Sequence, residues 1–432
     1  MNENYFEAAV RHWVDGKILE ENGEYDNAVC MQGFAAECAM KKILSAGFSD
    51  GEVRRYSHQG ETLLQDMTMM MTNDNELLSI LDPACGLRLS DISLPQILFK
   101  EHPERRYYPD GKYGQEEARQ CREAVAENGT KVVTFYSFKG GMGRTTALAG
   151  VALSLVKQGY DIMMVDTDIE APGLSTLFFD EDVVQRGVLD FLLEYPLIPE
   201  REISEYVLDI TDASLLNEED GRLFLLPAGK VDENYLQKLA RIDYQDNREG
   251  YLEDILKRLL NKIQAYYHVD YILIDARAGF HDMGGSVVSH IPHGAVLFGN
   301  NSRQSWDGIT QILRTLAESH VADWPLMLVD AMCESPTSSN YASQKEQFIQ
   351  KAYTTCVDNF YDNSSPMPGI EAEGVVHSPE FISFNYSLLN GIKLFSSGSQ
   401  EQDDIVQAYK EILTGSSYRK IADRIKEWFG ED

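Results

Sequence analysis

The sequence lacks any apolar run near the roughly 18 residues that a membrane-spanning helix needs. Its six cysteines are scattered through 432 residues, with no CxxC pair and no metal-ligand spacing. Neither a zinc site nor a disulfide framework is therefore indicated. Basic residues are also scarce, since 38 Lys and Arg stand against 69 Asp and Glu, for a net charge of −31. Such a surface repels phosphate backbones, which disfavours broad nucleic-acid binding.

The N-terminal segment lacks the basic-then-apolar pattern of an export signal, so we expect a cytoplasmic protein with reduced cysteines. Hydrophobic residues make up 43% and charged residues 25%, which is ordinary globular composition. A chain of 432 residues exceeds one domain of about 100–200 residues, so two domains are expected. The strong turn Asn128-Gly129 is the predicted boundary, which gives domains at 1–128 and 129–432.

The first domain is predicted to be helical, because apolar residues recur at offsets of three and four. The predicted helices cover 5–19, a second segment that follows the turn at 21–23, 61–71 and 115–126. After residue 129, short β-branched or aromatic runs alternate with amphipathic segments. Strands are predicted at 131–137, 161–165, 222–226, 271–274, 295–298 and 326–329, and helices at 145–158, 251–266, 305–318 and 417–429. Such alternation predicts an α/β fold with a parallel sheet that helices cover on both faces.

The segment 138–146 (FKGGMGRTT) follows the first of these strands and opens a helix. Three glycines, Gly140, Gly141 and Gly143, allow backbone N–H groups to turn around phosphate oxygens, and the helix N-terminus adds its dipole. Thr145 is suited to bind Mg²⁺ through its hydroxyl, and Thr146 to contact an inner phosphate. The other interpretation is a glycine-rich turn without a ligand. The strand–loop–helix context favours the phosphate site.

Two acidic motifs follow, each at the end of a predicted strand. The first is VDTDIEAPGL at 165–174 and the second is ILIDARAG at 272–279. An Asp after an apolar strand can simply cap a turn. Because the carboxyl ends of parallel strands meet at one edge of a sheet, three motifs in this order instead predict a single ligand site.

These motifs resemble the deviant Walker A, switch I and Walker B/switch II motifs of the ParA/MinD family of SIMIBI-type P-loop ATPases. The resemblance covers about residues 130–330, and the pattern KGGxGR[ST] looks like a distinct bacterial subgroup. It implies ATP with Mg²⁺, and a sandwich dimer in which Lys139 reaches the partner's nucleotide. The family's second lysine is Arg144 here, which keeps the charge but is planar and bulkier, so the hydrolysis rate is open.

The resemblance also implies roles for individual residues. The implied catalytic residues are Lys139, Arg144, Asp168, which would orient the attacking water, and Arg277. The implied metal ligands are Thr145, Asp166 and Asp275, the last through a water. The implied nucleotide-binding residues are Lys139, Gly140, Gly141, Met142, Gly143, Arg144, Thr145, Thr146, Gly279, Asn300 and Asp330.

Two of these residues have alternatives. Arg277 would either stabilise transition-state charge or form a structural salt bridge with a switch carboxylate. Asp330 would contact the base, where it could accept from guanine rather than adenine, or would be a simple turn residue.

The segment Ala28–Leu44 (AVCMQGFAAECAMKKIL) resembles the second helix of HEPN domains, and ERRYYP at 104–109 resembles another HEPN segment. Ribonucleases of that family use R-x(4–6)-H, but Arg54 and His58 have only three residues between them, and the sole match, Arg314 to His320, lies in the other domain. A scaffold, partner-docking or dimerisation role for 1–128 is therefore preferred to RNA cleavage. Fusions of this kind are associated with antiphage defence or signalling.

The resulting prediction is a nucleotide-dependent switch, a homodimer or higher oligomer, that binds an unknown protein partner through residues 1–128. The alternatives are a nucleotide-gated ribonuclease or toxin, and a scaffold that binds nucleotide without hydrolysing it.

The helix at 417–429 carries Tyr418, Ile421, Ile425 and Trp428 on one face. Packing onto the protein's own core is preferred to membrane contact, because Asp423 and Glu427 interrupt its basic residues.

Overall fold

The computed structural model describes most of the chain from residue 130 onward and a helical segment before it. The described residues are 5–44, 53, 55, 113–114, 117–118, 121, 130–180, 182–217, 219–242, 251–277, 292–319, 325–361, 367–389, 391–396 and 398–430. The chain divides into two compact units, Met1–Thr130 with Leu260–Tyr267, and Lys131–Leu259 with His268–Asp432. The predicted helix at 61–71, the turn at 128–129, the segment 104–109, Arg54, His58, Gly279 and His320 lie outside the described residues, as does most of 115–126.

The described part of the first unit is a pair of helices, α1 (Tyr5–Glu21) and α2 (Tyr25–Leu44), that pack against each other. The buried side of α2 is mostly small and apolar, with Ala28, Val29 and Ala35 almost fully buried. Polar contacts supplement this packing, because Gln32 donates to the Trp13 carbonyl at 3.3 Å. Both predicted helices are confirmed.

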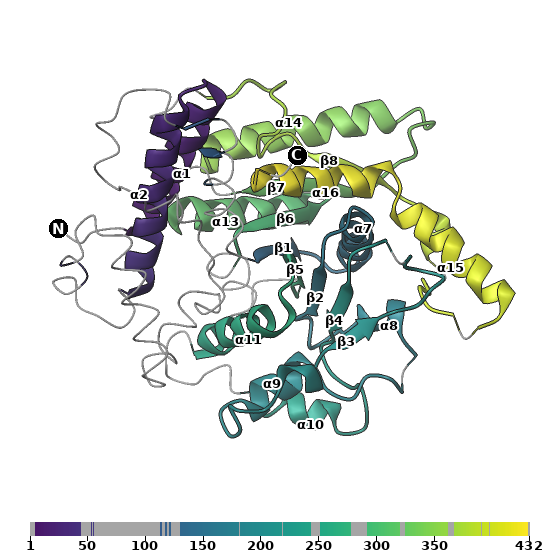
Figure 1. The fold of residues 1–432 in the computed structure, drawn as a ribbon. Coiled ribbons are helices and arrows are strands. Elements are labelled where there is room, and N and C mark those ends of the chain that lie inside the picture. Colours follow the sequence, from purple (N-terminus) through teal and green to yellow (C-terminus); the bar gives the residue numbers. More distant parts are fainter. Residues whose placement is uncertain are drawn as a thin grey trace. The chain divides into compact units, whose positions relative to one another are not determined.

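The second unit is built on strands alternating with helices, and Figure 1 labels them. Its strands are β1 (Lys131–Ser137), β2 (Ile162–Asp166), β3 (Leu208–Ile210), β4 (Leu223–Leu226), β5 (Tyr271–Asp275), β6 (Gly294–Gly299), β7 (Leu326–Cys333) and β8 (Glu380–Ser383). Its helices are α7 (Arg144–Val156), α8 (Ser175–Phe178), α9 (Val188–Glu194), α10 (Tyr235–Leu239), α13 (Arg303–Ser319), α14 (Tyr341–Asn359), α15 (Gln400–Leu413) and α16 (Ser416–Trp428), with short 3₁₀ turns at Ile203–Glu205 and Tyr386–Leu388. A further helix, α11 (Tyr251–Tyr267), precedes β5.

Eight described strands form one sheet in the order β3-β4-β2-β5-β1-β6-β7-β8, which Figure 1 shows from the lower strands to the upper ones. Every neighbouring pair is parallel except β3 with β4. The six predicted strands and the parallel sheet are confirmed. The chain leaves β1 toward β2 on one side and later returns to place β6 on the other. This reversal makes the carboxyl end of β1 the point where ligands bind in open α/β sheets.

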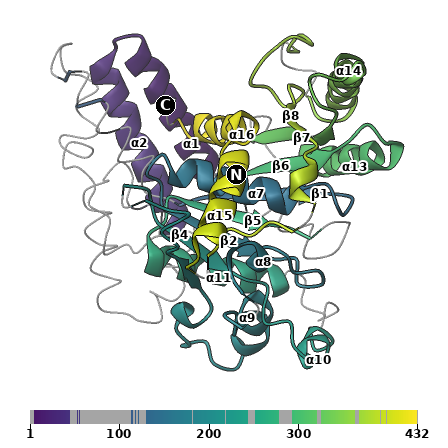
Figure 2. The same ribbon diagram turned by 90° about the vertical axis from the view of Figure 1, so that its right-hand side faces the viewer.

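Helices cover both faces of the sheet. Alternate strand residues, such as Phe135, Leu273 and Phe298, form one core with α7, α15 and α16, which lie together in Figure 2. On the other face α13 packs against β6, and α14 packs against β7. Ile421 and Ile425 of α16 are fully buried in the first core, so the predicted packing of this helix on its own domain is confirmed.

Candidate functional site

The loop between β1 and α7 leaves its backbone open for a ligand. Gly141 and Gly143 have φ angles of 73° and 72°, a region that side chains rarely adopt. Lys139, Gly140, Gly141 and Gly143 are exposed, and a Cβ added at Gly140 or Gly141 would meet no atom within 4 Å. Among the described residues no side chain caps α7. The first N–H groups of α7 and its dipole are thus available to an anion.

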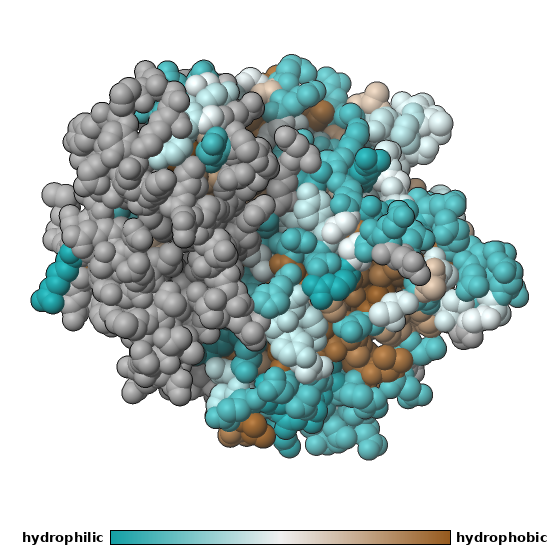
Figure 3. All heavy atoms as spheres, viewed as in Figure 1, coloured by the Kyte–Doolittle hydropathy of each residue, from teal (hydrophilic) through white to brown (hydrophobic). Residues whose placement is uncertain are grey.

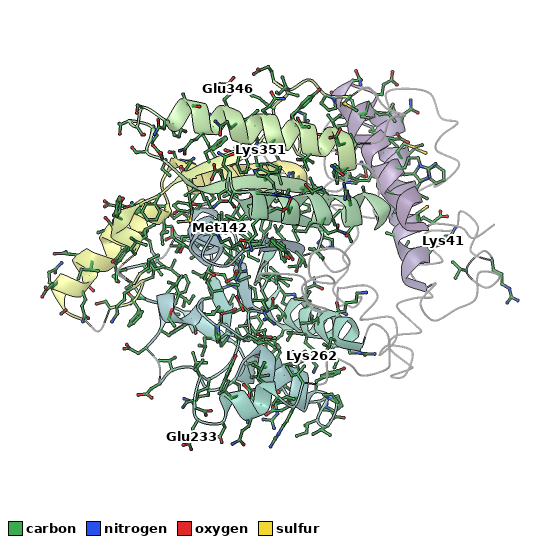
Figure 4. The ribbon with its side chains drawn as sticks, turned by 180° about the vertical axis from the view of Figure 1, so that it is seen from behind. Lys41, Met142, Glu233, Lys262, Glu346 and Lys351 are labelled. Carbon is green, nitrogen blue, oxygen red and sulfur yellow. The ribbon has the colours of Figure 1, made fainter. Side chains whose placement is uncertain are left out.

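Two buried contacts hold this exposed loop in position. The Phe138 ring lies so close to Gly308 of α13 that a Cβ there would come within 2.2 Å of it. Met142, which lies in the loop just before α7 and is labelled in Figure 4, is only 3% exposed. Asn300 directs its side-chain amide to the Met142 sulfur at 3.8 Å. The loop is therefore fixed to the end of β6 before any ligand binds.

Arg144, the first residue of α7, turns inward onto two carboxylates. Its Nε donates to Asp275 and its Nη2 donates to Asp168 at 3.0 Å, with the side chain only 8% exposed. Burial acts to lower the pKa of Arg144, but Asp275 and Asp168 outweigh it and raise that pKa. The guanidinium is a buried, permanently charged counterion for both motifs.

Asp166 and Asp275 occupy matching positions on neighbouring strands, and both are almost fully buried. Burial and the charge of Asp275 raise the pKa of Asp166 to about 8, against the backbone N–H groups of Leu174, Asp168 and Gly173, which lower it. Burial also raises the pKa of Asp275, although Arg144 opposes this. The carboxylate oxygens of Asp166 and Asp275 thus lie side by side at the end of the sheet, where they would attract an added cation.

Thr145 connects the loop to the second acidic motif, since its hydroxyl donates to Asp275 Oδ2 at 2.6 Å. Thr146 is half-buried one position further along α7. The neighbouring strand end is held as well, because the amide and hydroxyl of Thr167 both donate to the Asp275 carbonyl at 3.0 Å. Sequence reasoning missed this role of Thr167.

Arg277 forms an ion pair with Glu170 of the 165–174 motif, at the outer side of the cluster. This is the structural salt bridge that the sequence left as one alternative. Glu170 was visible in the motif, but its partner could not be derived from spacing.

Of the two residues suggested for base contact, Asn300 directly follows β6 and Asp330 lies within β7. Asn300 accepts from the Ser302 amide at 3.0 Å. Asp330 pairs with Gly299 within the strands and is 3% exposed, so it is a strand residue and the turn interpretation is wrong. Burial raises its pKa to about 6. The adjacent Ala331 carbonyl would lie 3.9 Å from a Cβ on Gly143.

The parallel sheet and the glycine-rich loop between β1 and α7 have the strand–loop–helix arrangement of a P-loop. Residues 130–319 match the model of the AAA_31 family, described as an AAA domain. The chain is 26% identical over 146 residues to a probable plasmid-partitioning ParA of Thermus thermophilus, covering 34% of this chain and 38% of that protein. It is 26% identical over 195 residues to the septum site-determining MinD of Neisseria meningitidis, covering 45% and 62%. The matched segment is thus similar in sequence to ParA and MinD proteins, and it contains the loop 138–146 and both acidic motifs.

Solved structures with a similar fold include pNOB8 ParA bound to nonspecific DNA, with a TM-score of 0.45, 15% identity, and coverage of 69% of this chain and 98% of that one. Another is MinD of Pyrococcus horikoshii complexed with Mg-ADP, with a TM-score of 0.42, 17% identity, and coverage of 70% and 98%. The chain spans 38% and 62% of the two curated relatives that it matches above. No described helix is long and apolar enough to cross a membrane.

Proposed function

We propose that the protein binds ATP with Mg²⁺ at residues 139–146 and hydrolyses it as a nucleotide-dependent switch. The observation that carries this is the open glycine loop beside Arg144, which lies between Asp168 and Asp275. A triphosphate supplies the anion that the loop and the α7 dipole favour. It also gives Arg144 an alternative partner to the two carboxylates.

The residues present fit Mg²⁺. Thr145, Asp166 and Asp275 offer only oxygen atoms, which hard cations prefer. Among the described residues no group of three His, Cys, Asp or Glu side chains could hold a metal by itself. That suits Mg²⁺, which usually keeps waters and takes its remaining ligands from the phosphates. When bound, Mg²⁺ would offset charge on the outer phosphates.

The transfer of Arg144 onto phosphate would release Asp168. The freed Asp168 carboxylate would then orient a water for attack. Asp275, no longer bonded to the guanidinium, would be available to hold Mg²⁺ through a water. Lys139 is exposed and forms no described hydrogen bond or ion pair, so it is available to a second subunit. We therefore propose a homodimer with nucleotide between the subunits.

Adenine is proposed from the resemblance of the loop to ParA/MinD motifs, with Asn300 and Asp330 near the base. Residues 1–128 are proposed to be a HEPN-like domain that docks a protein partner. Association with antiphage defence belongs to the same proposal. RNA cleavage by 1–128 is not favoured, because the residues that would perform it were not found at the required spacing.

The test of binding is isothermal titration of the protein with ATP and with GTP, each with magnesium. We expect heat of association with ATP and none with Gly143→Val, in which a branched side chain would have to adopt a φ of 72°. The control is Gly159→Val, which carries the same strain at φ 91° outside the loop. No heat for the native protein with either nucleotide would refute the proposal.

Hydrolysis is tested separately by steady-state phosphate release. We expect slow turnover that Asp168→Ala abolishes and that Asp209→Ala, an exposed aspartate on β3, leaves unchanged. Binding with no turnover in the native protein would instead favour the nucleotide scaffold. RNA incubated with and without ATP should stay intact, and cleavage would favour the toxin alternative.

A further inference from the structure

Three side chains from three separate segments of the chain hold three consecutive residues of the 165–174 motif. They are Arg144 on Asp168, Tyr235 on the backbone of Ile169, and Arg277 on Glu170. The first and third lie in motifs that sequence reasoning singled out. Tyr235 lies on α10 and belongs to none of them.

The Tyr235 contact is buried and directed at the backbone. Its hydroxyl donates to the Ile169 carbonyl at 2.8 Å, and the two residues are 5% and 1% exposed. A buried carbonyl without a donor is costly, so this hydroxyl satisfies a group that water does not reach. The contact joins residues 66 positions apart in the chain.

The short helix that carries Tyr235 is itself anchored. Lys238 donates to Asp190 Oδ1 at 2.9 Å, and Asp190 Oδ2 accepts the Gly187 amide at 3.1 Å. These contacts fasten α10 to α9, which lies beside it in Figure 1. At its start, Asp232 accepts the Asn234 amide at 2.9 Å. Tyr235 therefore presents its hydroxyl from a supported position.

We propose that Tyr235 is a positioning residue for Asp168, acting through the Ile169 carbonyl. The idea rests on the proposed function, in which Asp168 orients water. When Arg144 moves to phosphate, Asp168 loses its ion pair and keeps only the Ala171 amide, at 3.3 Å, as a described side-chain partner. The Tyr235 bond stays, because it involves only the neighbouring backbone. It then keeps the Asp168 backbone where its amide reaches Asp166 at 3.0 Å.

The test compares Tyr235→Phe with Tyr206→Phe. Each variant removes one buried hydroxyl in the same region, but the Tyr206 hydroxyl donates to Glu194 at 2.7 Å and does not contact the 165–174 motif. Hydrogen exchange is measured without nucleotide. Tyr235→Phe should speed exchange of the amides of 168–174 by roughly five- to tenfold, the population change expected for one lost hydrogen bond. Tyr206→Phe should leave these amides unchanged.

Phosphate release gives the second measurement. Tyr235→Phe should lower kcat by about fivefold at unchanged ATP affinity, whereas Tyr206→Phe should keep both. If the amides of 168–174 exchange in Tyr235→Phe at the same rate as in the native protein, the inference is overturned, whether or not the protein binds ATP. Faster exchange throughout β1 and β5 as well would also overturn it, because that indicates general destabilisation. Absence of ATP binding by the native protein refutes the proposed function alone, since the exchange comparison does not need nucleotide.

Discussion

At the scale of single residues, the loop arginine determines the state of the site without nucleotide. One guanidinium bonds two carboxylates, with Nε on Asp275 at the end of β5 and Nη2 on Asp168 in the loop after β2. A lysine has a single ammonium group and cannot reproduce this planar fork. Arg144 thus supplies an internal countercharge that a lysine would provide less completely.

Substitution of Arg144 should destabilise the nucleotide-free protein in a graded way. Arg144→Lys keeps the charge but loses one charged hydrogen bond, so we expect a loss of about 1–2 kcal/mol. Arg144→Ala leaves buried carboxylates without their counterion and should cost about 3–5 kcal/mol.

Urea unfolding measures the free energy of unfolding of both variants. The control is Arg222→Lys, whose ion pair with Asp161 is 58% exposed on the arginine side and should change stability by less than about 0.5 kcal/mol. Equal effects at the two arginines would contradict this assignment.

Asp330 is a second residue whose buried environment should affect the stability of the protein, here in a way that depends on pH. Burial raises its pKa from 3.8 to about 6, and its one described hydrogen bond is accepted from the Met332 amide at 3.5 Å. A raised carboxyl pKa means that the folded state binds a proton more tightly than the unfolded chain. The contribution of Asp330 to stability is therefore complete below pH 4 and is lost as pH rises through about 6.

Asp330→Asn should remove that dependence, since the amide is neutral at every pH and keeps an oxygen for Met332. We expect the stability advantage of the variant over the native protein to be about 2 kcal/mol larger at pH 8 than at pH 4.5. Urea unfolding at the two pH values measures the difference, and the other titrating groups cancel in the comparison. A constant difference between the two proteins would show that Asp330 does not titrate in this range.

At the scale of elements, the sequence was informative where hydrophobic pattern decides the structure. Residues 132–137 are buried on both faces of the sheet, and their mostly apolar run predicted this directly. The antiparallel strand β3 (LDI) and the edge strand β8 (EFIS) were not predicted, because each has only two apolar residues and so carries too little pattern. Helices α14 and α15 were also missed. Their exposed sides are long and polar, which weakens the apolar signal.

The candidate site was predictable in part for the same reason. Glycines and carboxylates at strand ends identified the loop and both acidic motifs. The sequence could not reveal that Arg144 would bond Asp168 and Asp275, or that Tyr235 would reach Ile169. These contacts join residues 24 to 131 positions apart and depend on how the elements pack. The hydrophobic periodicity of a single helix or strand does not predict them.

At the scale of the whole molecule, charge opposes association. The net charge is −31, and on the face shown in Figure 3 the described surface is mostly hydrophilic, with smaller hydrophobic patches. Two such chains repel each other, and added salt screens that repulsion, since the Debye length falls to about 8 Å at 0.15 M. A proposed nucleotide-dependent dimer must therefore gain its free energy locally, at the loop where the exposed Lys139 offers a positive charge.

Dimerisation should consequently need ATP and Lys139 and should strengthen with salt. We expect the native protein to form dimers with ATP and magnesium, more completely at 0.3 M than at about 0.05 M salt, because screening reduces the repulsion between chains. Lys139→Ala should remain monomeric while still binding nucleotide, whereas Lys157→Ala, an exposed lysine at the far end of α7, should dimerise normally. Sedimentation analysis with and without ATP measures this. If the Lys139→Ala protein dimerised like the native one, the cross-subunit lysine would be refuted, and a dimer that weakened with salt would show that charge attraction dominates the interface.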